Sequence, residues 1–199
     1  SCAMATVGLA DGEHCAAVAA AAAELSQPGG LDIVALGRAS AAGGNPVIPL
    51  VKMLRERVGQ EGVPASVVHP GATSQDIMDC ALMLLTRRAG AVVLADLTRA
   101  ADSAAHLARI HRSTPMVART LGQQALPTTF GLLASSWFTA LDAAAIRLEI
   151  VLSTLPVQFG GAAGTLAALY PDGLRIADAL ADELGLARQV TPWHTDRVT

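Results

Sequence analysis

The residues that could carry chemistry are most concentrated in the segment His69-Pro70-Gly71-Ala72-Thr73-Ser74-Gln75-Asp76. It combines an imidazole, two hydroxyls, an amide and a carboxylate directly before a long helical pattern. Thr73-x-x-Asp76 has the form of a capping box, with Asp where Glu or Gln is usual. The free N–H groups and the positive dipole end of the helix that follows would favour a carboxylate ligand here. The octet taken alone fits an ordinary helix start equally well.

Two further polar segments punctuate the chain, at 119–129 and 158–165. The first offers an arginine, two glutamines and three threonines. The second is rich in glycine but carries no lysine after its last glycine and follows no clear strand, which argues against a nucleotide-binding P-loop. Its glycines could still present backbone N–H groups to a carboxylate.

Several other kinds of site are excluded by spacing and charge. The five histidines lack the spacing of a metal site, and no G-x-S-x-G elbow occurs, so we predict no metal site and no serine hydrolase. A net charge of −3 with one lysine, Lys52, leaves no basic stripe for nucleic acid. Cys2, Cys15 and Cys80 show no C-x-x-C spacing and are typical of a reducing compartment.

The elements that must position these segments are predicted to be helices. The composition is 52% hydrophobic but only 3% aromatic, with long alanine runs, which favours an all-α fold. Breaks at proline and glycine predict helices over 3–25, 31–41, 45–58, 74–112, 127–155 and 171–185, with a loop at 59–68. The fourth would be about 55 Å long. We predict a small N-terminal lobe at 1–68 and a long-helix bundle at 69–199.

Two long helices joined by a loop pair antiparallel, and a pair alone cannot bury their apolar surface. Self-association into a larger bundle is therefore expected. No apolar run reaches membrane-spanning length and the chain does not begin with a signal peptide, so the prediction is a cytoplasmic protein that binds no membrane.

Five motifs occur in one order and carry a resemblance to a known family. They are Gly44-Asn45-Pro46-Val47-Ile48-Pro49-Leu50-Val51-Lys52, the octet at 69–76, Thr114-Pro115-Met116 with Arg119-Thr120-Leu121-Gly122-Gln123-Gln124-Ala125-Leu126-Pro127, Gln158–Thr165 and Pro192-Trp193-His194-Thr195. Together they resemble the fumarase/aspartase/adenylosuccinate lyase superfamily over nearly the whole chain. Within it, the resemblance is greatest to the 3-carboxy-cis,cis-muconate cycloisomerase branch.

This resemblance implies a homotetramer whose long helices form a central bundle, with active sites shared between subunits. It implies a small polycarboxylate substrate and no cofactor. The branch adds a substrate carboxylate to the substrate's own double bond, which gives 4-carboxymuconolactone in protocatechuate breakdown (the β-ketoadipate pathway).

The resemblance also assigns residues, all as substrate contacts. They are Asn45, His69, Thr73, Ser74, Arg119, Thr120, Gln123, Gly164, Thr165, Thr195 and Arg197. For each of them, a purely structural role in a loop or cap is the alternative.

Two departures from the family pattern matter. Leu121 stands where adenylosuccinate lyases and fumarases carry an acid–base histidine, and leucine cannot transfer a proton. The mobile Ser-Ser-x-Met-Pro loop that carries the family's catalytic serine does not occur in this sequence. We therefore expect an inactive fragment that contains no catalytic residue of its own. The alternatives are a fumarate-releasing lyase, which Leu121 disfavours, and a non-catalytic helical oligomer that binds carboxylates.

Overall fold

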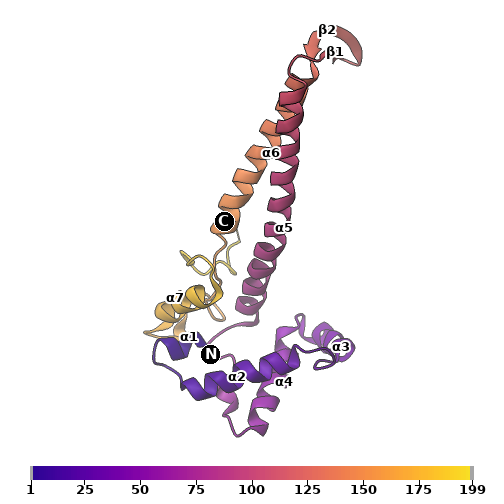
Figure 1. The fold of residues 1–199 in the computed structure, drawn as a ribbon. Coiled ribbons are helices and arrows are strands. Elements are labelled where there is room, and N and C mark those ends of the chain that lie inside the picture. The colour runs from indigo at the N-terminus through magenta and orange to yellow at the C-terminus, as the bar shows by residue number, and fades with distance from the viewer. Residues whose placement is uncertain (1, 198–199) are drawn as a thin grey trace. The chain divides into compact units, whose positions relative to one another are not determined.

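The computed structural model describes residues 2–197 and is predominantly helical (Figure 1). Its elements are α1 (Cys2–Thr6), α2 (Gly12–Leu25), α3 (Ile33–Gly43), α4 (Val47–Gln60), the 3-10 turn η1 (Ala65–Val67), α5 (Ser74–Ile110), β1 (Pro115–Thr120), β2 (Gln123–Thr129), α6 (Phe130–Ser153), the 3-10 turn η2 (Ala167–Leu169) and α7 (Gly173–Leu184). The predicted all-α class is confirmed, and so is the long helix that begins at Ser74.

The predicted helix over 3–25 is wrong, because two helices cover that range. Asp11, which is exposed, is the N-cap of α2: its carboxylate accepts hydrogen bonds from the backbone N–H of Glu13 at 2.7 Å and of His14 at 3.4 Å. Alanine on both sides of the break conceals it in the sequence, since alanine favours helix wherever it stands.

The segment at 119–129 forms strands and is neither a loop nor the start of a helix. β1 and β2 pair antiparallel around the two-residue turn Leu121-Gly122, in which both residues have positive φ. Pro127 lies opposite Val117 in β2, and α6 begins at Phe130, so the predicted helix start at Pro127 is wrong. A two-stranded ribbon consists of edges, where proline is tolerated. Leucine is an unusual first residue for such a turn, which is why the hairpin escaped prediction.

The chain divides into two compact units, Ser1–Leu84 with Pro156–Thr199, and Leu85–Leu155. In the described part of the first unit, buried apolar side chains cluster around Phe159 and Ile176, and others around Val58 and Val68. The predicted division of this chain into 1–68 and 69–199 stays a prediction; its outermost residues, 1 and 198–199, lie outside the described part of the chain.

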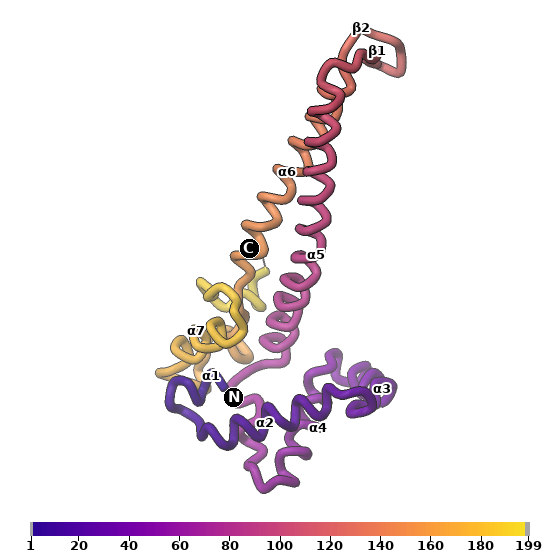
Figure 2. Tube along the Cα trace, viewed as in Figure 1, coloured from indigo at the N-terminus to yellow at the C-terminus, as the bar shows by residue number. Residues whose placement is uncertain are grey.

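In the second unit, α6 runs alongside α5 (Figure 2). The contact is close at Gly90, where an added Cβ would stand 2.4 Å from Cδ2 of Leu152. The two helices nevertheless leave much apolar surface uncovered. In the parts of α5 and α6 that belong to the second unit, the exposed large apolar side chains are Leu85, Val92, Val93, Ile110, Leu132, Leu133, Trp137, Ile146, Ile150 and Val151. Among the helices that the structure describes, none combines the length and the apolar character needed to cross a membrane.

Candidate functional site

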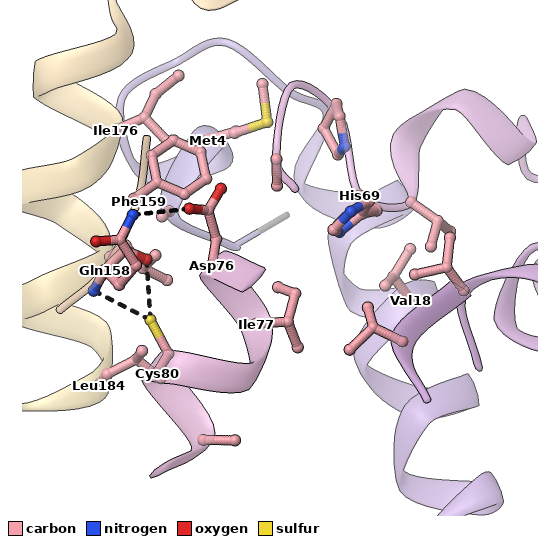
Figure 3. A pocket seen from close by; sticks show the side chains of 18 of the residues that line it. Met4, Val18, His69, Asp76, Ile77, Cys80, Gln158, Phe159, Ile176 and Leu184 are labelled. Carbon is pink, nitrogen blue, oxygen red and sulfur yellow. Dashed lines mark hydrogen bonds between the residues drawn. The ribbon is translucent and has the colours of Figure 1, made fainter. Parts of the chain in front are cut away.

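The carboxylate of Asp76 is the centre of the first unit's polar loops. It is only 1% exposed, and its Oδ2 accepts a hydrogen bond from the N–H of Thr73 at 2.9 Å. This is the carboxylate half of the capping box that the sequence predicts. The same side chain also accepts the N–H groups of Gly160 and Gly161, each at 3.0 Å. It accepts the side-chain amide of Gln158 as well, at 3.0 Å (Figure 3). Asp76 thus ties the start of α5 to the glycine segment 158–165.

This contact changes the expected role of the glycine segment. Its backbone N–H groups do bind a carboxylate, but at Gly160 and Gly161 it is the carboxylate of Asp76 and not that of a ligand. Gly164, with positive φ, and the exposed Thr165 lie farther along the same segment. Their assignment as substrate contacts stays a prediction.

Gln158 is completely buried and connects Asp76 to the segment 191–197. Its Oε1 accepts the backbone N–H groups of Trp193 at 2.7 Å and His194 at 3.1 Å, and its Nε2 donates to Asp76. These partners fix the orientation of the amide, so the contact of Nε2 with Nδ1 of His194, at 2.7 Å, is a donation to that nitrogen. The imidazole proton therefore lies on Nε2, which is buried and has no hydrogen-bond partner among the described residues.

A second buried carboxylate, Asp79, holds Arg197. The terminal nitrogens Nη2 and Nη1 of Arg197 donate to Oδ1 and Oδ2 of Asp79, at 2.8 and 3.1 Å. Asp79 also accepts a hydrogen bond from the side-chain amide of Gln75. Arg197 lies in addition over the ring of Trp193, at 5.3 Å. Arg197, which the family resemblance assigns to substrate binding, is thus already paired with a carboxylate of this chain. Thr195, two residues before it, is exposed and lies near Gly164. Substrate contacts by Thr195 and Arg197 stay predictions.

Three of the predicted contacts do come together. His69, Thr73 and Ser74 line one cavity of about 530 Å³ at the start of α5, together with residues of α4. His69 has a φ of 62°, unusual for a residue with a side chain. Burial, followed by the charge of Arg55, lowers the pKa of the His69 imidazole below its ordinary 6.5, while Asp76 opposes that shift. His69 is therefore neutral at pH 7 and can donate a hydrogen bond from one nitrogen.

The other predicted residues lie elsewhere. Asn45 caps α4, since its Oδ1 accepts the N–H groups of Val47 at 3.0 Å and Ile48 at 3.3 Å. Arg119, Thr120 and Gln123 belong to the hairpin of the second unit, where their side chains are exposed. For these four, contact with substrate stays a prediction.

A second cavity, of about 400 Å³, is almost entirely apolar and is shown in Figure 3. Cys80 lines it, and its Sγ donates a hydrogen bond to the carbonyl oxygen of Gln158 at 3.1 Å. Burial raises the pKa of the Cys80 thiol to about 11, so the thiol stays protonated at pH 7 and is no nucleophile. Within residues 2–197, no group of three or more His, Cys, Asp or Glu is placed to hold a metal ion.

Sequence reasoning missed the polar residues that organise this unit: Asp76 as a bridge, Gln158, Asp79 and Arg55. A signal was available for the first two, because a carboxylate in the octet and a glycine segment rich in N–H groups are complementary. No local pattern indicated that Asp79 is buried, since its partner Arg197 lies 118 positions away.

The chain is similar to known proteins along its whole length. All 199 residues match the family model described as Lyase. A nitrosuccinate lyase of Streptomyces davaonensis is 47% identical over 190 residues, 90% of this chain and 40% of that protein. A 3-carboxy-cis,cis-muconate cycloisomerase of Bradyrhizobium diazoefficiens is 50% identical over 168 residues, 83% of this chain and 37% of that protein.

The fold has solved counterparts as well. The crystal structure of a 3-carboxy-cis,cis-muconate lactonizing enzyme from Pseudomonas putida superposes with a TM-score of 0.90 at 41% identity, over 98% of this chain and 44% of that one. The chain spans about two fifths of the length of these curated relatives. Because a family match along the full chain, relatives near half identity and a shared fold all agree, the chain belongs to the Lyase family of the fumarase/aspartase superfamily.

Proposed function

We propose that the complete protein is a 3-carboxy-cis,cis-muconate cycloisomerase, which forms 4-carboxymuconolactone in protocatechuate degradation. The observation that carries this proposal is the cavity shared by His69, Thr73 and Ser74. It offers hydroxyls, a neutral imidazole and the start of a 37-residue helix, a combination suited to holding carboxylates. The cycloisomerases among the relatives support the choice of substrate.

In the proposed reaction, one carboxylate oxygen of the substrate forms a bond to an alkene carbon of the same molecule. The electron pair moves to the neighbouring carbon, which then takes up a proton, and a γ-lactone results. The residues of this chain bind and orient the carboxylates, His69 by donating a hydrogen bond and Thr73 and Ser74 through hydroxyl and backbone groups. The family resemblance assigns proton transfer to a serine loop that does not occur in this sequence, so the chain alone is expected to be inactive.

A second candidate is a lyase acting on nitrosuccinate, favoured by the 47% identity to such an enzyme across 90% of the chain. Loss of a proton and of nitrite from neighbouring carbons of nitrosuccinate would leave fumarate. Nitrosuccinate has two carboxylates for the cavity to bind, whereas 3-carboxy-cis,cis-muconate has three. An adenylosuccinate lyase is less well supported, since Leu121 replaces the acid–base histidine and lies fully exposed at the tip of the hairpin.

The proposal includes a homotetramer with shared active sites in the cytoplasm. The exposed apolar side chains of α5 and α6, among them Leu85, Trp137 and Ile150, support burial against further copies. Sedimentation of the full-length protein tests this point, and a monomer at micromolar concentration would refute it.

Activity is tested on the full-length protein with each substrate separately. Loss of the ultraviolet absorbance of the conjugated diene measures cycloisomerisation, and release of nitrite measures the second candidate. Turnover of 3-carboxy-cis,cis-muconate with little nitrite release supports the proposal, and the reverse supports the lyase. Tight binding of a polycarboxylate with no turnover of either compound would instead indicate a non-catalytic binding oligomer.

A further inference from the structure

The cavity at the start of α5 has a cationic wall that the family motifs do not assign. Lys52, Arg55 and Glu56 of α4 line it together with His69, Thr73 and Ser74. Arg55 follows the quoted motif Gly44–Lys52 by three residues, so sequence reasoning passed over it. Its side chain nevertheless shares one cavity with three predicted substrate contacts.

The guanidinium of Arg55 is held in place by the backbone. Its Nη2 donates a hydrogen bond to the carbonyl oxygen of Val68 at 3.1 Å, directly before His69. A guanidinium has five N–H donors, and this contact uses one of them. The charge also reaches His69, whose pKa it helps to lower. Arg55 therefore stands close to the imidazole with donors left for a ligand.

Arg55 is also the charge in this wall that no carboxylate balances. Lys52 lies 4.0 Å from Glu56, and both side chains are largely exposed, at 79% and 62%. Among the described residues, no carboxylate forms an ion pair with Arg55. With His69 neutral, the four charged or titratable lining residues carry one net positive charge, and its source is Arg55.

We propose that Arg55 is a specificity-determining residue that binds the third carboxylate of a tricarboxylate substrate. This inference rests on the proposed function, because it assumes that the cavity holds the substrate. The start of α5 with Thr73, Ser74 and His69 then takes the carboxylates common to dicarboxylates and tricarboxylates. The planar guanidinium selects the compound that has one more, by paired N–H···O contacts that a lysine cannot reproduce.

The test uses the full-length protein and two probes, propane-1,2,3-tricarboxylate and pentanedioate, which differ by the central carboxylate. Calorimetric binding constants are measured for the wild type, Arg55→Gln, Arg55→Lys and the matched control Arg38→Gln, at an exposed arginine of α3 that does not line the cavity. We expect Arg55→Gln to weaken the binding of the tricarboxylate roughly fivefold more than that of the dicarboxylate, which is the scale of one solvent-accessible ion pair. Arg55→Lys should recover part of that selectivity, and Arg38→Gln should leave the selectivity unchanged.

The ratio of the two affinities is decisive, since a residue that only braced Val68 would affect both probes alike. Equal effects of Arg55→Gln on the two probes, or equal selectivity losses in Arg55→Gln and Arg38→Gln, overturn the proposal. Turnover of 3-carboxy-cis,cis-muconate is measured in parallel. If the wild type lacks turnover but Arg55→Gln still loses tricarboxylate selectivity, the proposed function fails and the role of Arg55 stands. If the wild type binds neither probe, the role of Arg55 fails, and turnover alone decides the proposed function.

Discussion

Replacing the carboxylate of Asp76 by an amide should destabilise the first unit strongly. Each oxygen of Asp76 accepts two N–H groups: Oδ1 from Gln158 and Gly160, and Oδ2 from Thr73 and Gly161. In Asp76→Asn, one of these atoms becomes an NH2 group, which cannot accept a hydrogen bond. Two buried donors then face a donor and lose their acceptor.

The expected cost follows from that count. A buried donor left without a partner costs about 1–3 kcal/mol, so Asp76→Asn should lower the free energy of unfolding by about 2–6 kcal/mol. Such a loss is a large part of the roughly 5–15 kcal/mol that stabilises a typical domain. The matched control is Asp102→Asn, also on α5 but exposed, which should change stability by less than about 0.5 kcal/mol.

Urea unfolding followed by circular dichroism measures both variants. Hydrogen exchange adds a local readout, because the amide protons of Gly160 and Gly161 should exchange faster in Asp76→Asn and at the wild-type rate in Asp102→Asn. If the two variants unfold at the same urea concentration, or if Gly160 and Gly161 keep their protection, the carboxylate does not hold the glycine segment and this account of the site is refuted.

Three further predictions concern single residues. His69→Ala in the full-length protein should weaken substrate binding or turnover by about 1–3 kcal/mol, the value of a charge-assisted hydrogen bond, and unchanged kinetics would remove His69 from the site. Because the pKa of His69 is lowered in the folded state, the unfolded chain binds the proton first, so this group's stabilising contribution is full above pH 6.5 and is lost as pH falls below it. NMR titration should show this pKa below 6.5 and higher in Arg55→Gln; a pKa at or above 6.5 in the wild type would contradict it. Gly90→Val should lower the free energy of unfolding by about 1–3 kcal/mol, measured by thermal unfolding, since the valine side chain would overlap Leu152. A double variant with Leu152→Ala should recover part of the loss. An unchanged melting temperature in Gly90→Val would show that the two helices do not meet there.

Much of the fold could be predicted from the sequence because helices leave local traces. Proline and glycine breaks and apolar spacing placed α3, α4, α5 and α7 within a few residues of their observed bounds. The hairpin could not be predicted in the same way. Its turn, Leu121-Gly122, lacks the Asn or Asp that usually marks such a connection, and Pro127 is more typical of a helix start than of a strand.

In the candidate site, too, the residues that are close in sequence were predictable and the long-range contacts were not. His69, Thr73 and Ser74 are neighbours in the sequence and are neighbours in one cavity, so their grouping was predictable. The bridges from Asp76 to Gly160 and from Asp79 to Arg197 join segments that no local pattern connects. Arg55 is a similar case, because its relation to His69 depends on how α4 packs.

The discontinuity of the first unit has a consequence for how the chain folds. The backbone leaves this unit at residue 84 and returns at 156, and the hydrogen bond from Gly160 to Asp76 closes a loop of 84 residues. Closing a long loop is costly in chain entropy before its contacts form, and non-local contacts slow folding. The antiparallel pairing of α5 with α6 shortens that loop, so we expect the helical hairpin to form first. During synthesis, the polar centre around Asp76 must then wait until the glycine segment has left the ribosome.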